Sequence, residues 1–218
     1  VKMIKIAPSL IALDFTRLGE ELALLEQAGA DFLHLDVMDG CLVPNITFGP
    51  LVVAACKRAT RLPLQTHLMI VQPDKYLDAF AEAGASALWV HAEARGDVVA
   101  NLKRIRELGC SPGLAIDPPT GVEGLEELLP LVDTVLVMTV PAGFGGQAFR
   151  EDCLAKVPPL VKLREQLELS FEIAVDGGVK LSNASHVREA GVDIIISGTG
   201  LTKAGLPYQE AIAEMRSA

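Results

Sequence analysis

The chain has 218 residues, 50% of them hydrophobic and 5% aromatic, and a formal net charge of −9. This length fits one large domain, and the scarcity of aromatic side chains favours aliphatic layers of strands and helices over a β-sandwich. The negative charge argues against nucleic acid as a partner, because binding to a phosphate backbone depends on Lys and Arg. No apolar run approaches about 18 residues, so a membrane span is not expected.

Short apolar strands alternate with amphipathic helical stretches along the whole chain. Strands are expected at residues 4–10, 32–37, 62–69, 87–91, 112–116, 134–139, 171–175 and 194–197. Helices are expected at residues 14–28, 50–60, 73–84, 97–108, 122–129, 153–167, 183–190 and 208–215. Asp14 is a suitable N-cap for the first of these helices, and Pro158 with Pro159 predicts a break or a late start in the sixth.

This strict alternation predicts βαβ units and a parallel sheet. Eight units without an extra segment fit a closed (β/α)₈ TIM barrel of minimal size, formed by residues 1–218 as a single domain. An open doubly wound sheet is the alternative. It usually carries a dinucleotide-binding G-x-G-x-x-G after its first strand, and this chain has none there.

The cysteines predict the compartment. Cys41, Cys56, Cys110 and Cys153 are widely spaced and form no C-x-x-C pair. This favours reduced thiols and a cytoplasmic protein over a disulfide framework. The first residues lead directly into a strand pattern, so no signal peptide is expected, although Val1 leaves the true start of the protein open.

The strand at residues 32–37 and the loop behind it have the sequence FLHLDVMDGCLVPN. Because side chains alternate along a strand, His34, Asp36 and Met38 share one face and the aliphatic residues between them share the other. An imidazole and a carboxylate two residues apart are candidate ligands for a divalent metal. The competing interpretation is a strand whose polar side chains face solvent.

Other polar residues stand where a barrel would place catalytic groups, at the C-terminal ends of its strands. His67 lies near the end of the third expected strand and Asp176 directly follows the seventh, so these two could join His34 and Asp36 around one divalent cation. Any one such histidine is more often structural, but the coincidence of four residues favours a joint site. His91 is expected to support the site or the fold, and His186 to be exposed on a helix.

Such a site suggests its own chemistry. Two carboxylates and two neutral imidazoles balance a divalent cation, which can polarise a substrate carbonyl and stabilise an enediolate. Because Asp36 and Asp176 approach from opposite sides, one could remove a proton from a carbon and the other return one, which inverts that centre. Met38, Met69 and Met138 are expected to line the site with apolar surface, or to be ordinary barrel filler.

Glycine-rich turns follow the last three strands. They comprise Gly143, Phe144, Gly145 and Gly146 after strand six, Gly177 and Gly178 after strand seven, and Gly198, Thr199 and Gly200 after strand eight. Barrels often bind phosphate through the backbone N–H groups of such loops. No conspicuous Lys or Arg accompanies them, so the backbone would hold the phosphate.

Together these segments resemble the ribulose-phosphate 3-epimerases along nearly the whole chain. The resemblance is carried by APSL with Asp14-Phe15, GADFLHLDVMDG, VPNITFGP, THLMI, MTVPAGFGGQAF and VDGGV. It implies epimerisation at C3 of a ketose phosphate, most simply of D-ribulose 5-phosphate to D-xylulose 5-phosphate. It also implies one divalent ion per chain (zinc, iron(II), manganese or cobalt) and a homo-oligomer.

The resemblance also assigns roles to single residues. His34, Asp36, His67 and Asp176 match the family's metal ligands, and Asp36 and Asp176 match its acid/base carboxylates. The residues that match substrate contacts are Ser9, His67, Gly143, Phe144, Gly145, Gly146, Gly177, Gly178, Gly198 and Thr199.

The chain departs from the family pattern at several places. Cys41-Leu42 stands where His-Phe is usual, Pro141-Ala142 where Asn-Pro is usual, and Ala174 where a carboxylate is common. Asp117-Pro118 replaces a usual Asn-Pro, and the turn after strand eight reads SGTGL instead of AGSA. None of these positions matches a ligand or an acid/base residue, so the expected reaction type is unaffected. Several of them border the substrate, which leaves open a sister epimerase for a hexulose 6-phosphate or a tetrulose phosphate.

The residues also bear on two rival functions. A decarboxylase or aldolase-type synthase on the same barrel typically needs a Lys two residues after the strand-two Asp, and Met38 stands at that position. A barrel that only binds a sugar phosphate has no use for two opposed carboxylates. Both rivals are therefore less favoured than an epimerase.

Overall fold

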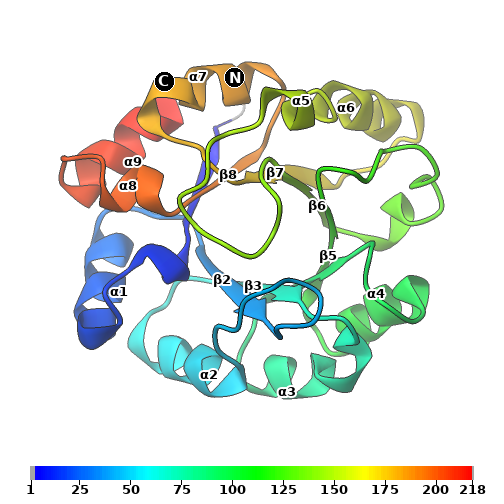
Figure 1. Cartoon of the computed structure of the whole chain (residues 1–218), viewed down its shortest axis with the longest axis horizontal. Helices are drawn as coiled ribbons and strands as arrows, with labels where there is room; N and C mark the ends of the chain where they lie inside the picture. Colours follow the sequence, from blue (N-terminus) through cyan, green and yellow to red (C-terminus); the bar gives the residue numbers. More distant parts are fainter. Residues whose placement is uncertain (1–2, 218) are drawn as a thin grey trace.

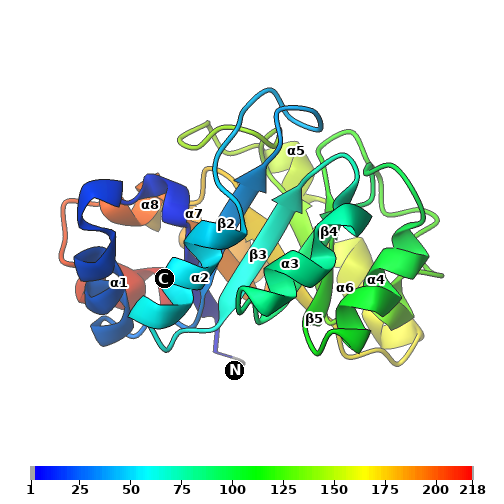
Figure 2. The same cartoon turned by 90° about the horizontal axis from the view of Figure 1, so that it is seen from below.

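The computed structural model of the chain describes residues 3–217. Eight parallel strands follow one another around a ring, and helices cover its outer side (Figures 1 and 2). The strands are β1 (Lys5–Pro8), β2 (Leu33–Met38), β3 (Leu64–Met69), β4 (Ala87–His91), β5 (Ser111–Ile116), β6 (Thr134–Met138), β7 (Glu172–Asp176) and β8 (Ile194–Ser197). The predicted (β/α)₈ barrel is confirmed.

The ring is nearly closed. Hydrogen-bonded neighbours run in the order β1-β8-β7-β6-β5-β4-β3-β2, and every pair is parallel. The two ends of this order, β1 and β2, meet at an isolated parallel bridge between Ser9 and His34. Strands of such a barrel are covered on both faces, which is why all six residues of β2 and all six of β3 are buried.

The α-helices lie on the outside of the ring, most of them between successive strands and the last two after β8. They are α1 (Leu18–Gln27), α2 (Pro50–Ala59), α3 (Leu77–Glu82), α4 (Val98–Glu107), α5 (Glu151–Leu154), α6 (Val157–Gln166), α7 (Leu181–Glu189), α8 (Thr199–Thr202) and α9 (Tyr208–Ser217). Among the residues that the structure describes, no helix combines the length and the apolar character needed to cross a membrane.

Local caps and breakers explain the helix boundaries. The Asp14 side chain accepts a hydrogen bond from the N–H of Thr16 and starts a 3₁₀ turn, Phe15–Arg17, directly before α1. The expected helical stretch at 153–167 is broken, as Pro158 and Pro159 predicted. The chain instead forms α5 and a separate α6 with these prolines in its first turn, where a missing N–H does no harm.

The helix expected at residues 122–129 is wrong. This stretch consists of bends and turns, and a 3₁₀ turn, Leu129–Leu131, begins at its last residue. Gly124 adopts φ = +83°, a left-handed conformation that ends a right-handed helix. The apolar spacing of this segment is satisfied by packing Val122, Leu125 and Leu129 under the loop instead.

Buried apolar side chains form two clusters. The larger one lies between the sheet and the helices, and the smaller one fills the inside of the barrel. Met38, Met69, Trp89, Met138 and Ala174 belong to the inner cluster. Trp89 faces Gly113 across β4 and β5, and a Cβ on that glycine would lie 2.1 Å from the indole. Gly113 therefore leaves the space that the buried tryptophan occupies.

Candidate active site

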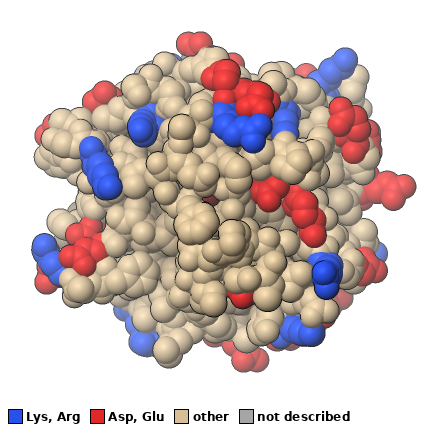
Figure 3. Space-filling view, in the orientation of Figure 1, with Lys and Arg blue, Asp and Glu red and all other residues tan. Residues whose placement is uncertain are grey.

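The loops at the C-terminal ends of the strands surround a cavity of about 650 Å³. Figure 2 shows these loops above the tips of β2 and β3, and in Figure 1 the loop between β6 and α5 passes across the middle of the ring. The surface at the centre of this face is formed mainly by uncharged residues, with Lys, Arg, Asp and Glu towards its edge (Figure 3). The cavity therefore opens on the face where barrels of this type carry their chemistry.

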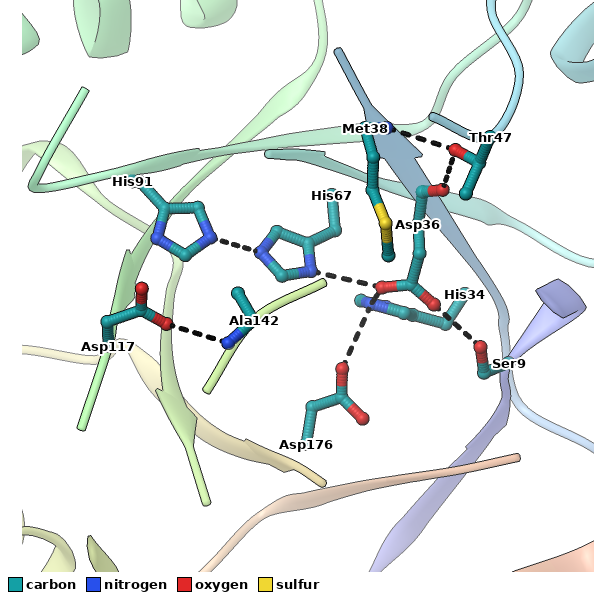
Figure 4. Close-up of polar contacts among 10 residues, drawn as sticks. All are labelled: Ser9, His34, Asp36, Met38, Thr47, His67, His91, Asp117, Ala142 and Asp176. Carbon is teal, nitrogen blue, oxygen red and sulfur yellow. Dashed lines mark hydrogen bonds and ion pairs between the residues drawn. The ribbon is translucent and has the colours of Figure 1, made fainter. Parts of the chain in front are cut away.

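Strand register brings the polar predictions together at the bottom of the cavity. Asp36 on β2 is the register partner of His67 on β3, and Asp176 on β7 is that of Met138 on β6. One ligand atom each from His34, Asp36, His67 and Asp176 can be chosen so that all four lie within 4.8 Å of one another. Figure 4 shows these side chains converging from β2, β3 and β7.

Asp36 is the centre of this cluster. Its Oδ1 lies 3.2 Å from His67 Nδ1 and 3.2 Å from His34 Nε2, and its Oδ2 accepts a hydrogen bond of 2.6 Å from the Ser9 hydroxyl. Thr47 holds the backbone on either side of it, donating its hydroxyl to the Asp36 carbonyl and accepting from the Met38 N–H. The carboxylate is thus held in one orientation, with 2% of the residue exposed.

The two carboxylates differ in electrostatics. Burial acts to raise the pKa of Asp36, but its imidazole neighbours, foremost through the nearby charge of His34, outweigh burial and hold that pKa below its usual range. Asp176 receives less compensation, so burial and the nearby charge of Asp36 raise its pKa to about 7. The site therefore contains one firmly ionised carboxylate and one that exchanges its proton near neutral pH.

The imidazoles are buried and suited to binding a cation. Neither ring nitrogen of His34 has a hydrogen-bond partner among the described residues, although the side chain is fully buried. Its Nε2 lies 3.9 Å from Asp176 Oδ2 and close to Asp36, an arrangement that a cation between these atoms would satisfy. Burial lowers the pKa of His67 to about 4, so this ring is neutral, as a metal ligand must be. The donor set fits a divalent metal.

The remaining predicted residues surround the cavity above this cluster. It is lined by Ser9, Met38, Met69, Met138, Gly143, Phe144, Gly145, Gly146, Gly177, Gly178, Gly198 and Thr199. His67 does not line the cavity and is fully buried beneath it. His91 lies behind His67, with its Nε2 2.8 Å from His67 Nε2, and His186 is exposed on α7 beside Glu151.

Glycine is required at two adjacent positions of the turn after β7. Gly177 has φ = +122° and a Cβ there would lie 2.5 Å from Val140, while Gly178 has φ = +70° and a Cβ would lie 2.4 Å from the N of Phe149. The turn after β7 can therefore approach the loop after β6 only without side chains. This close approach brings the backbones of two glycine loops to one side of the cavity.

Several residues of the site were not anticipated from the sequence. Glu93 contacts His91, Asn45 donates its side-chain N–H to the Gly143 carbonyl at 2.7 Å, and Thr47 orders β2. Phe15 and Phe48 add apolar surface to the cavity. The H-x-E spacing of His91 and Glu93 at the end of a strand was the one visible signal among them.

The fold and the cluster define a (β/α)₈ barrel with a candidate metal centre at the C-terminal ends of its strands. Residues 5–202 match the model of the ribulose-phosphate 3 epimerase family, and this chain belongs to that family.

Relatives agree with this assignment over the full chain. The ribulose-phosphate 3-epimerase of Synechocystis is 45% identical over 99% of this chain and 94% of its own length. That of Bacillus subtilis is 43% identical over 98% and 99%. The chloroplastic ribulose-5-phosphate-3-epimerase of Arabidopsis thaliana is 40% identical over 97% of this chain and 76% of its own.

Solved structures of lower identity share the fold. KGPDC from Streptococcus mutans superposes with a TM-score of 0.71 at 14% identity, over 99% of this chain and 97% of that one. A 3-hexulose-6-phosphate synthase superposes with a TM-score of 0.65 at 20% identity, over 99% and 98%. At these identities the likeness concerns the barrel alone.

Proposed function

We propose that this protein is a metal-dependent isomerase that epimerises C3 of D-ribulose 5-phosphate to give D-xylulose 5-phosphate. The observation that carries the proposal is the meeting of Asp36 and Asp176 with His34 and His67 at the bottom of the cavity. Membership of the ribulose-phosphate 3 epimerase family supports the same reaction.

In this proposal Asp36 and Asp176 are the catalytic residues. One carboxylate takes the proton from C3 on one face of the sugar, and the other, in its acid form, delivers a proton to the opposite face. The return reaction exchanges the two roles. The placement of the pair supports this division, because Asp36 comes from β2 and Asp176 from β7, two strands that are not neighbours in the barrel.

His34, Asp36, His67 and Asp176 would hold one divalent cation, for which zinc, iron(II), manganese and cobalt are all suitable. A cation bound there supplies Lewis-acid stabilisation for the negative charge that develops when the C3 proton leaves. The Ser9 hydroxyl orients Asp36, and Met38, Met69 and Met138 exclude water from the reacting carbon.

The substrate phosphate would lie at the glycine turns formed by Gly143, Gly145, Gly146, Gly177, Gly178 and Gly198, with Phe144 and Thr199 beside them. Backbone N–H groups would hold it, because no Lys or Arg among residues 3–217 lines the cavity. Met38 occupies the position at which a decarboxylating or C–C-cleaving barrel typically needs a Lys, which supports proton transfer without bond cleavage between carbons.

The test is exchange of the C3 proton. Metal-loaded protein in deuterated water should introduce deuterium at C3 of D-ribulose 5-phosphate and produce D-xylulose 5-phosphate. Absence of exchange with this substrate, combined with exchange on a hexulose 6-phosphate or a tetrulose phosphate, would replace the proposed substrate. Absence of exchange with all three would contradict an epimerase.

The oligomeric state and the cellular location of the protein are further proposals. We expect a homo-oligomer in the cytoplasm. Two apolar side chains close in sequence support an interface, since Ile46 is 76% and Leu51 is 83% exposed in the single chain. Light scattering after size exclusion measures the oligomer, and a strictly monomeric mass would contradict it.

A further inference from the structure

A chain of hydrogen-bonding groups extends from the candidate metal centre into the loop after β4. His67 Nε2 faces His91 Nε2 at 2.8 Å, and His91 Nδ1 faces Glu93 Oε2 at 3.1 Å. The two rings are inclined by only 16°, and their nitrogens are at hydrogen-bond distance, so the rings meet edge to edge (Figure 4). Both imidazoles are fully buried.

Glu93, the last group in this series of hydrogen bonds, can only accept hydrogen bonds. Glu93 Oε1 already accepts from the N–H of Asp117 at 2.9 Å and from the hydroxyl of Thr120. Burial acts to raise the pKa of Glu93, but its bonds from His91, Thr120 and Asp117 together lower it to about 2. An ionised carboxylate has no proton to give, so His91 must donate from Nδ1.

With one ring proton on each imidazole, the positions of the remaining protons follow by elimination. A His91 that donates from Nδ1 then has a lone pair on Nε2, and this lone pair can only accept. His67 must then carry its proton on Nε2, which leaves the lone pair on Nδ1. That atom is the one that faces Asp36 Oδ1 at 3.2 Å and belongs to the four-residue cluster.

We propose that Glu93, acting through His91, fixes the tautomer of His67 and thereby presents His67 Nδ1 as a ready ligand to the metal. The inference rests on the proposed metal site. Glu93 and His91 are positioning residues, because neither belongs to the four-residue cluster nor lines the cavity. Carboxylate–histidine pairs behind a metal ligand commonly change metal affinity about 10–100-fold when they are mutated.

Glu93→Gln is the informative variant, because it preserves the shape of the side chain and reverses the direction of the hydrogen bonds. The donors from Asp117 and Thr120 hold the amide oxygen at the Oε1 position, so the amide NH₂ must face His91 Nδ1. His91 then protonates Nε2 and His67 protonates Nδ1, which removes the ligand's lone pair. Glu93→Ala only removes the acceptor from His91 Nδ1, so both tautomers of His67 stay accessible.

Two measurements test the proposal: the dissociation constants for Zn²⁺ and Co²⁺ against a chromophoric chelator, and the ring ¹⁵N shifts of the zinc-loaded protein. We expect affinity to fall about 10–100-fold in Glu93→Gln and by less in Glu93→Ala. A role in packing alone predicts the opposite order, since Ala removes more contacts. In the wild type, the ring proton should lie on Nε2 of His67 and on Nδ1 of His91.

Glu172→Gln is the matched control, since it changes a half-buried carboxylate that is bonded to Lys5 on β1 and does not line the cavity. Its metal affinity should equal that of the wild type. Unchanged affinity in Glu93→Gln, or a proton on Nδ1 of His67 in the wild type, overturns the inference while leaving the proposed metal site intact. A wild type that binds neither ion at His34 overturns both.

Discussion

Asp36 and Asp176 are two carboxylates in one small buried volume, and their surroundings separate their pKa values in opposite directions. Asp36 has three polar neighbours, in Ser9, His34 and His67, while Asp176 has the more distant His34 and the backbone N–H of Gly177. The difference of environment therefore provides a base and an acid from the same residue type.

Asp176→Asn should lower the turnover number by at least about 10²–10⁴-fold, because an amide cannot exchange the second proton. Asp36 remains able to act as a base on one face, so deuterium exchange should persist with one epimer and disappear with the other. Assays at saturating metal, with circular dichroism to check the fold, measure this. Asp97→Asn is the control, since Asn also caps a helix such as α4. Near-full activity in Asp176→Asn would refute the pair mechanism.

Individual residues of the cluster could be predicted from the sequence. Side chains alternate along a strand, and barrels carry their catalytic groups at the C-terminal ends of their strands. His34 and Asp36 had to share a face, and His67 had to lie next to them once β2 and β3 paired. Hydrogen-bond partners were not accessible in this way. The contacts of Glu93 with Thr120 and of Asn45 with Gly143 join loops that are distant in sequence, and no periodicity reports such contacts.

At the scale of elements, β4 and β5 pack inside the barrel by placing a large side chain on one strand opposite a glycine on the other. Trp89 is fully buried, and its register partner is Gly113. Gly113→Ala would place a Cβ 2.1 Å from the rigid indole, so we expect a loss of about 1–3 kcal/mol in the free energy of unfolding. Urea unfolding measures the loss.

Gly19→Ala provides the matched comparison. This glycine lies in α1, and a Cβ there meets nothing within 4 Å. The same substitution should therefore stabilise the protein by up to about 1 kcal/mol. Equal effects at the two positions would contradict the packing argument for Trp89.

The elements themselves were predictable where the hydrophobic period agreed with the residues that start or end an element, as in β2 and α4. They were not predictable where glycine geometry overrides the period, as at residues 122–129, where Gly124 is left-handed. The short helix α8 was also unanticipated, because its sequence TGLT has weak helix propensity and is one turn long.

At the scale of the whole molecule, a bound cation should stabilise the folded barrel. The four groups of the cluster converge only in the folded chain, so an ion that binds them favours folding by mass action. Zinc at about 100 times its dissociation constant should add about 2.7 kcal/mol, or roughly 5–11 °C in the melting temperature. Scanning calorimetry before and after chelation measures the shift.

His34→Ala should abolish most of that shift, because it removes a buried ligand. His186→Ala should keep it, because His186 is exposed and paired with Glu151 away from the cluster. A shift of equal size in both variants would show that the stabilising ion binds elsewhere.

We also propose that residues 1–218 form one cooperative domain, because the two ends of the chain complete the same barrel. β1 pairs with β8, and Arg216 on α9 donates to Asp31 at 2.6 Å, to the Gly29 carbonyl at 2.9 Å and to the Ile4 carbonyl at 3.2 Å. Arg216→Ala removes the donor that these acceptors share, which typically costs about 1–3 kcal/mol, although Asp31 keeps the N–H of Ile6. We expect a lower denaturation midpoint with an unchanged slope and a single transition, since the last helix cannot separate from the first strand alone.

Lys103→Ala on the exposed face of α4 should leave the midpoint unchanged. Hydrogen exchange that shows α9 opening independently of β1 and β8 would divide the chain into more than one folding unit.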